Sequence, residues 1–323
     1  MAENSVGNLV TDIHNEAYHT VFESPRITSE NLFFTDNRPK ESLNGLWSFV
    51  LDQYDTGLRS DWFRGKCRRS SEETPYDYSV DQGTTMEVPS CWNMADLEYL
   101  HYEGSAWYSR SFPYKPTVNG ERVFLRVGAA NYECKVFLNG HHLGSHSGGS
   151  TPFLVELTPW LQSENWLQLW VNNDRTLDRV PMRNTDWFNY GGIYRDVDLF
   201  RLPHEFLTEF SLRLKPDGNF DRVVVEVAVS DAGAGDSVTV IIPELALEEH
   251  IKLRKGRGIL QVPCKPQLWS PESPKLYQAI ARYGTDEITD HVGFRQIAVS
   301  NGTIELNGQP IFLRGISVHE DDL

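Results

Sequence analysis

The stretch VFLNGHHLGSHSGGSTPF, residues 136–153, decides the fold class. An apolar run of strand length, residues 135–138, ends here at the pair Asn139-Gly140. Asn-Gly accepts positive φ at both central positions of a type I′ turn, and the twist of that turn matches the twist of a β-hairpin. The stretch therefore predicts two antiparallel strands joined by a tight turn.

The same pattern recurs along most of the chain. Runs that alternate, or stay apolar for the length of a strand, lie at residues 122–127, 167–171 and 222–229. Further Asn-Gly or Asp-Gly pairs that suit turns lie at residues 119–120, 217–218, 301–302 and 307–308. Nearly every strong periodicity is two, not 3.6. The sequence predicts an all-β protein of many short antiparallel strands.

The length of 323 residues exceeds what one ordinary core uses, so more than one domain is expected. Residues up to 203 are rich in Trp, Tyr and Asn, with an ordered core expected from about residue 40. Residues 204–298 hold short Val-rich strands, with the length and turn spacing of an immunoglobulin-like sandwich. A third segment, residues 299–323, contains the run PIFLRGI at 310–316, whose few polar positions predict a strand buried on both faces.

Composition and charge narrow the classes of partner. The formal net charge is −15, a sign that repels phosphate backbones and anionic membranes, so neither nucleic acid nor a membrane is expected as a partner. The basic run at residues 66–69 is flanked by acidic residues and predicts a solvated loop. No stretch reads as a signal peptide or approaches 18 consecutive apolar residues.

Four cysteines, at positions 67, 91, 134 and 264, lie far apart without a CxxC spacing. So long a chain needs no disulfide staples, and free thiols in a reducing compartment are the expectation. A cytoplasmic location follows from this expectation. A periplasmic or secreted protein whose signal had been removed would have the same sequence.

The last five residues, HEDDL, gather a histidine and three carboxylates. Sugar hydrolases use two carboxyl groups about 5–5.5 Å or about 6.5–9.5 Å apart. Glu320 and Asp322 on an extended strand would be about 6.6 Å apart by the rise along the chain. Nothing in these residues would bury one acid or enclose a sugar, so taken alone they predict a solvated acidic terminus.

Two aromatic stretches are candidates for ligand contact. The stretch at residues 185–197, TDWFNYGGIYRDV, could stack on a sugar face and hydrogen-bond its hydroxyls, although a structural aromatic turn is the favoured alternative. The residues at 91–94 and 101–108 have the same aromatic and amide character, and Trp92 and Trp107 could equally fill a sandwich core.

Three histidines, His141, His142 and His146, follow the Asn139-Gly140 turn without nearby carboxylates or thiolates, so no metal is expected there. The pair Gly148-Gly149 lacks a lysine and a following helix pattern, and it is not a phosphate loop. The sequence predicts neither a metal nor a cofactor.

Seven motifs in order resemble the family 2 glycoside hydrolases, the group of β-galactosidases, β-glucuronidases and β-mannosidases. They are LNGLWSF at 43–49, VPSCWN at 88–93, YEGSAWYSRSF at 102–112, the opening stretch at 136–153, DWFNYGGIYRDVDL at 186–199, LWSPESPKLY at 268–277 and VGFRQIAVSNGTIELNGQPIFLRGISVHED at 292–321. Any one of these motifs is weak evidence, whereas seven in the right order are strong.

The resemblance implies a jelly-roll sandwich of the sugar-binding type over residues 1–203, then the immunoglobulin-like sandwich, then a (β/α)8 barrel that holds two catalytic glutamates. Such a barrel takes about 250 residues, and only 25 lie from position 299 onward. The chain is therefore expected to stop after the first barrel strand, to lack counterparts of both catalytic glutamates and to be inactive alone.

The resemblance also implies residues for a sugar pocket. Asp186 matches the aspartate that the jelly roll extends to the terminal sugar, and His319 matches a histidine that lines the same pocket, with Glu320 and Asp321 beside it. Asn189, followed by Tyr190, agrees with the glucuronidase-like form of the motif and is expected to bind substrate. The loop around Asn93 is expected to reach towards the site. Val318 stands where many members have a basic residue, which leaves the sugar subgroup open.

The leading hypothesis is the N-terminal portion of a retaining β-glycosidase that hydrolyses terminal β-linked sugars. One alternative is a stand-alone carbohydrate-binding protein without catalysis. Another is a structural partner that completes a separately encoded barrel. A carbohydrate is the expected ligand in the first two hypotheses, and homo-oligomers are common in the family.

Overall fold

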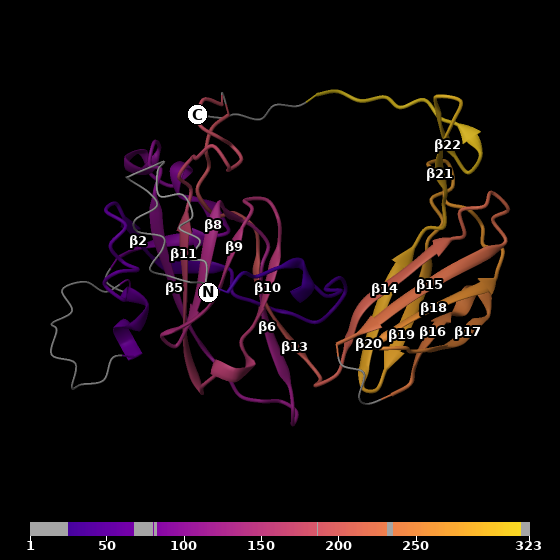
Figure 1. Cartoon of the computed structure of the whole chain (residues 1–323), viewed down its shortest axis with the longest axis horizontal. Helices are drawn as coiled ribbons and strands as arrows, with labels where there is room; N and C mark the ends of the chain where they lie inside the picture. Colours follow the sequence, from indigo (N-terminus) through magenta and orange to yellow (C-terminus); the bar gives the residue numbers. More distant parts are fainter. Residues whose placement is uncertain (1–24, 68–79, 81–82, 186, 231–234, 318–323) are drawn as a thin grey trace, which may run out of the picture.

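The structure is a computed structural model that describes residues 25–67, 80, 83–185, 187–230 and 235–317. Within these residues the regular elements are β-strands and short 3-10 helices. Two β-sandwiches lie side by side, followed by a small sheet and an extended segment (Figure 1). The all-β prediction is confirmed. The 3-10 helices are η1 (Ser29–Asn31), η2 (Trp62–Cys67), η4 (Trp92–Met94), η5 (Leu97–Tyr99), η6 (Thr158–Trp160) and η7 (Pro243–Leu245).

The first sandwich is built from three antiparallel sheets. The largest has the order β3-β2-β5-β11-β8-β9, with β3 (Thr84–Val88), β2 (Gly45–Asp52), β5 (Ser105–Pro113), β11 (Glu164–Asn172), β8 (Glu133–Leu138) and β9 (His141–Ser147). The facing sheet has the order β1-β13-β6-β10, with β1 (Glu41–Ser42), β13 (Val197–Leu202), β6 (Arg122–Val127) and β10 (Phe153–Glu156). A small sheet at one end has the order β4-β12-β7, with β4 (Ser90–Cys91), β12 (Gly192–Ile193) and β7 (Ala130–Asn131).

The predicted hairpin is confirmed as β8 and β9, which pair antiparallel from Glu133 opposite Ser147 to Leu138 opposite His141. Asn139 and Gly140 have φ of 51° and 80°, as a type I′ turn requires. The pairs at 301–302 and 307–308 also have positive φ at both residues. At 119–120 and 217–218 only the glycine does, so these two turns are of another type.

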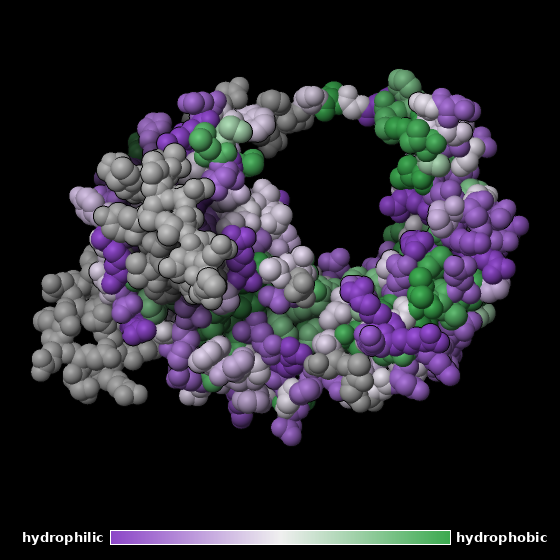
Figure 2. Space-filling model, in the orientation of Figure 1, coloured by the Kyte–Doolittle hydropathy of each residue, from purple (hydrophilic) through white to green (hydrophobic). Residues whose placement is uncertain are grey.

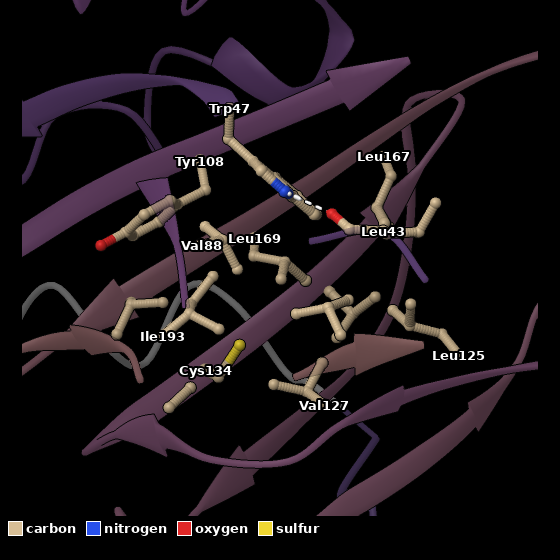
Figure 3. Packing of buried hydrophobic residues seen from close by; sticks show 14 of the residues in the cluster. Leu43, Trp47, Val88, Tyr108, Leu125, Val127, Cys134, Leu167, Leu169 and Ile193 are labelled. Carbon is tan, nitrogen blue, oxygen red and sulfur yellow. Dashed lines mark hydrogen bonds between the residues drawn. The ribbon is translucent and has the colours of Figure 1, made fainter. Parts of the chain in front are cut away.

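Aliphatic and aromatic side chains fill the space between the two large sheets (Figure 3). Alternate residues of β11, namely Leu167, Leu169 and Val171, point inward and are fully buried. Trp47 is also buried, and its indole N–H donates to the Leu43 carbonyl at 2.8 Å. The period of two in the sequence thus places one face of each strand in this core.

The opposite face of the six-stranded sheet is also covered. Trp107, Phe137 and Trp170 project from it and are fully buried. They pack with the segment that follows β2, where the rings of Phe63 and Phe137 stack at 4.6 Å. The indole N–H of Trp107 donates to the Asp52 carboxylate at 3.1 Å. Of the two alternatives for Trp107, the structure supports core filling.

The second sandwich packs a three-stranded sheet against a four-stranded one, and the immunoglobulin-like prediction is confirmed. The strand orders are β14-β15-β18 and β17-β16-β19-β20, with β14 (Leu207–Leu214), β15 (Arg222–Val229), β18 (Arg257–Pro263), β17 (Leu247–Lys252), β16 (Ser237–Ile242), β19 (Tyr277–Tyr283) and β20 (Asp286–Val292). Its core is mainly valine, isoleucine, leucine and alanine.

Residues 33–38, called the strap below, connect the two sandwiches although they lie before the expected start of the ordered core. Phe33 packs edge-on against Phe124 of β6 at 5.0 Å between ring centroids, and against Phe206 just before β14 at 5.3 Å. The guanidinium of Arg38 forms a bidentate ion pair with Asp286 of β20 at 2.7 and 2.8 Å, and both side chains are buried. The second oxygen of Asp286 also accepts from the backbone N–H of Leu207 at 2.8 Å.

The C-terminal segment differs from its prediction. A small sheet of β21 (Ile297–Ser300), β22 (Thr303–Leu306) and β23 (Gln309–Pro310) is followed by residues 311–317, which form no strand. The side chains of Phe312 and Ile316 are 84% and 90% exposed. The prediction of a strand buried on both faces is wrong for the described residues, because β22 pairs only with the start of the run, at Pro310 and Ile311, and no described strand covers the rest. Hydrophobic surface also lies over β21 and β22 at the upper right of Figure 2.

Candidate functional site

The candidate site is the loop between β11 and β12, which carries the motif DWFNYGG. Buried asparagines hold both ends of this loop. The amide nitrogen of Asn173, just after β11, donates to the Asn189 carbonyl at 3.1 Å, and the amide nitrogen of Asn189 returns a bond to the Asn173 carbonyl at 2.5 Å. Asn131 of β7 donates to the side-chain oxygen of Asn189 at 3.2 Å and to the Tyr190 carbonyl at 2.6 Å. The loop is therefore closed at its base by reciprocal amide bonds.

Asn93, in η4, joins a neighbouring loop to the same base. Its side-chain nitrogen lies 3.0–3.2 Å from the carbonyl oxygens of Tyr99, Leu100 and Tyr102, and its side-chain oxygen accepts from the Gly191 N–H at 2.7 Å. Asn93 is buried, so these bonds replace water for several backbone groups at once. The loop around Asn93 does lie beside the candidate loop.

The paired glycines are required by close packing. A Cβ on Gly191 would overlap the ring of Trp92, and a Cβ on Gly192 would lie 2.9 Å from the hydroxyl oxygen of Tyr108. Gly192 also has φ of +125°, a region that side chains disfavour. Trp92 is fully buried and fills this end of the sandwich, as the structural alternative for it predicted.

Two buried tyrosine hydroxyls at this end, those of Tyr102 and Tyr108, stay neutral near neutral pH. The Tyr102 hydroxyl donates to the Ser105 carbonyl at 2.7 Å, and burial is the main cause that raises the pKa of Tyr102. Burial likewise raises the pKa of Tyr108. Neither phenol is prepared to act as a base near neutral pH.

The outer part of the loop is apolar and exposed. Trp187 is 57% exposed, while the rings of Phe188 and Tyr190 contact each other at 4.8 Å between centroids. Leu177, Val180 and Met182 of the same loop are also exposed. An accessible indole beside hydrogen-bonding loops can stack on a sugar ring. Among the described residues of this motif, Trp187 has the side chain best placed to meet a ligand.

Asn189 is buried, whereas Trp187 is exposed. It is 6% exposed, and both atoms of its amide are bonded within the protein. Its predicted substrate contact stays a prediction, and the geometry favours support of the loop. Asn131 and Asn173, which complete the network, were not among the residues selected from the sequence. The only feature of the sequence that could have indicated Asn131 and Asn173 is an amide side chain at the end of a strand.

The other predicted pocket residues cannot be placed. Asp186, Val318, His319, Glu320, Asp321 and Asp322 lie outside the described residues. Arg68 and Arg69 of the basic run do as well. The structure therefore brings Asn93, Asn189 and Tyr190 together and leaves the predicted histidine and carboxylates untested.

The three histidines of the opening stretch do not converge. The ring of His141 stacks on Trp160 at 4.1 Å, that of His142 lies against Phe137 at 4.8 Å, and that of His146 stacks on Phe153 at 4.5 Å. Burial lowers the pKa of His142 to about 4, and the Lys135 charge acts in the same direction. Within the described part of the chain, no three His, Cys, Asp or Glu side chains cluster as metal ligands would.

Known family models match the residues of both sandwiches. The family described as "Glycosyl hydrolases family 2, sugar binding domain" matches residues 40–203, and "Glycosyl hydrolases family 2" matches residues 207–295. The β-glucuronidase of Felis catus is 29% identical over 332 aligned positions, which cover 88% of this chain and 49% of that protein. The β-glucuronidase of Paenibacillus borealis is 25% identical, with 89% and 50% covered.

Solved β-glucuronidase structures have a fold similar to that of this chain. The β-glucuronidase of an uncultured Clostridium species superposes with a TM-score of 0.69 at 27% identity, covering 87% of this chain and 49% of that one. The Lactobacillus rhamnosus β-glucuronidase gives 0.68 at 27% identity, with 88% and 49% covered. The chain spans about half the length of the curated relatives it matches.

Proposed function

The chain belongs to family 2 of the glycosyl hydrolases, and we propose that it forms the sugar-binding and sandwich portion of a retaining β-glycosidase that acts on terminal β-linked glucuronides. The observation that carries the proposal is the order of the two matched domains, which together span residues 40–295 with a short gap just before β14. The choice of glucuronides is supported by the names of the relatives.

A retaining glycosidase uses two carboxyl groups about 5–5.5 Å apart, one as nucleophile and one as acid and base. By resemblance both belong to a barrel, so the role proposed for this chain is to bind and orient the sugar. Asp186, His319 and Glu320 are proposed to hydrogen-bond its hydroxyls, and Trp187 to cover one face. The asparagine network is proposed to fix the position of Trp187 relative to the sandwich, because it anchors the loop on both sides of this residue.

The test measures hydrolysis of aryl β-glucuronide, β-galactoside and β-mannoside. Residues 1–323 alone are expected to hydrolyse none of them. The whole protein encoded by the gene is expected to prefer the glucuronide. In that protein Asp186→Ala should lower kcat/KM by about 10- to 100-fold, the loss expected for a charged hydrogen bond to the substrate. Asn219→Ala, at an exposed turn, is the matched control.

Two results would contradict the proposal. Preference of the whole protein for galactoside or mannoside would remove the glucuronide assignment. Hydrolysis by residues 1–323 alone, at a rate comparable with the whole protein, would place the catalytic groups within this chain.

We also propose a cytoplasmic location for the protein. Cys91, Cys134 and Cys264 are free thiols, which supports a reducing compartment such as the cytoplasm. None of the helices among the described residues is long and apolar enough to cross a membrane. Fractionation of cells that express the native gene, followed by detection of the protein, would test the cytoplasmic assignment.

A further inference from the structure

A second concave site lies on the first sandwich, at the open edge of β9 and away from the Trp187 end of the loop. It encloses about 610 Å³, within the range of small-molecule sites. The backbone of residues 25–27 forms one rim, because Ser145 donates to the Pro25 carbonyl at 2.9 Å and Ile27 donates to the Ser145 carbonyl at 2.8 Å. Residues 178 and 179, from the loop after β11, form the opposite wall.

Charged side chains form the floor of this pocket. Lys135 of β8 is 5% exposed, pairs with the Glu133 carboxylate and places its ammonium 4.9 Å from the centroid of the Trp170 ring. Arg179 donates to the other oxygen of Glu133 at 2.8 Å and lies over the Tyr132 ring at 5.3 Å. Both cations are thus fixed in place by partners on several sides, which is how a site is preorganised for a ligand.

The pocket carries more positive than negative charge. Arg26 at the rim adds a third cation to Lys135 and Arg179, against Glu133 and Asp178. Burial is the main cause that lowers the pKa of His146, so this ring adds no charge near neutral pH. A surplus of cations is unusual in a chain with a net charge of −15. The pocket therefore favours an anion over a neutral molecule.

The remaining groups argue against a simple inorganic anion. Two carboxylates repel a phosphate of nearly two negative charges more strongly than a sugar acid of one, and they can also accept hydrogen bonds from the hydroxyls of a sugar. Hydroxyl groups of Thr28, Ser145 and Ser147 line the same pocket and can donate or accept. The combination of cations, carboxylates and hydroxyls matches a molecule that has one acidic group and several hydroxyls.

We propose that the pocket lined by Arg26, Lys135, Asp178 and Arg179 is a second carbohydrate site, which binds a small acidic sugar through its carboxylate. This site is lined by Asp178 and Arg179 from the same loop that carries Trp187, but not by Trp187 itself, and it does not depend on the glycosidase assignment. Arg26 and Lys135 attract the carboxylate, Glu133 accepts from hydroxyls, and Asp178 at the wall repels the carboxylate.

The experiment titrates residues 1–323 with D-glucuronate by isothermal calorimetry, with D-glucose and inorganic phosphate as comparison ligands. Glucuronate is expected to bind with a dissociation constant of the order of 1 mM, and the other two at least about fivefold more weakly. Arg26→Gln should weaken glucuronate binding about 10-fold, because it removes an accessible cation at the rim. Asp178→Asn should strengthen binding, because it removes a like charge.

Opposite effects of these two variants distinguish recognition from a general loss of structure. Arg213→Gln, in an exposed ion pair on the second sandwich, is the matched control and should change nothing. Trp187→Ala separates the two sites, since it should leave this binding unchanged. The proposal is overturned if glucuronate does not bind, if phosphate or glucose binds as tightly, or if Trp187→Ala abolishes binding while Arg26→Gln does not.

Discussion

The two sandwiches reach stability by different means. The first packs aromatic side chains on both faces of its six-stranded sheet, and Trp47, Trp92, Trp107 and Trp170 are fully buried there. The second has one aliphatic core, and its strands alternate buried and exposed positions, as in β19. Most tryptophans of the first sandwich are therefore core material. Of the nine tryptophans, Trp187 is the most exposed and remains the candidate for sugar contact.

The largest expected effect tests the aromatic layer directly. Trp107→Ala should lower the free energy of unfolding by about 4 kcal/mol, because it leaves a large cavity and removes a partner of Asp52. Val240→Ala, at an equally buried position of the second sandwich, should cost about 2 kcal/mol. Urea unfolding followed by circular dichroism measures both. If both variants lost the same free energy of unfolding, the aromatic layer would contribute no more to stability than the aliphatic core.

The polar end of the first sandwich should be the next most sensitive. Asn93→Ala should cost about 3 kcal/mol, because it leaves the Gly191 N–H and several carbonyl groups buried without this partner. Asn219→Ala, at an exposed turn, should change the free energy of unfolding by less than about 0.5 kcal/mol. Thermal unfolding of both variants beside the parent chain measures the difference. A cost for Asn93→Ala close to that of its control would show that water replaces the amide.

The smallest expected effect is a change with pH in the stability of the first sandwich. The pKa of His142 is lowered to about 4 in the folded chain by burial, against about 6.5 when unfolded. Its contribution to stability is fully present above pH 6.5 and is lost progressively as the pH falls towards 4, because the unfolded state binds the proton more readily. His142→Gln should therefore show a smaller fall in Tm between pH 6.5 and 4 than the parent chain.

His141→Gln is the control for this pH series, because His141 is exposed and belongs to the same strand. Its Tm should follow the parent chain across the pH range. If His142→Gln also follows the parent curve, proton uptake by His142 does not contribute to acid destabilisation.

Much of the fold could be predicted from local pattern. The period of two and the pair Asn139-Gly140 are local signals, and the hairpin, the all-β class and the immunoglobulin-like sandwich follow from such signals. Residues 311–317 show the limit, because their apolar pattern predicts burial without specifying what would cover them. A pattern reports what a strand could bury, and its neighbours decide whether it does.

The candidate site was less predictable for a related reason. The substrate contact expected of Asn189 rests on the glucuronidase-like form of its motif, yet an amide can bind a sugar hydroxyl or close a buried network, and the sequence does not distinguish the two uses. The partners that decide it, Asn131 and Asn173, lie 58 and 16 positions away along the chain. The sequence likewise does not distinguish Trp187 from Trp92. Only the exposed fraction of each side chain in the structure separates an indole that can stack on a sugar from one that fills the core.

The strap has a consequence for the order of events during synthesis. Arg38 precedes its ion-pair partner Asp286 by 248 positions, so at about 5–20 residues per second it leaves the ribosome roughly 12–50 seconds earlier. During that interval the first sandwich can fold. The Arg38 guanidinium does not yet have its partner Asp286 from the second sandwich. The Arg38–Asp286 ion pair thus forms late, because Asp286 begins β20, the last strand of the second sandwich along the chain. A nascent chain stalled before position 286 would lack both that strand and the ion pair.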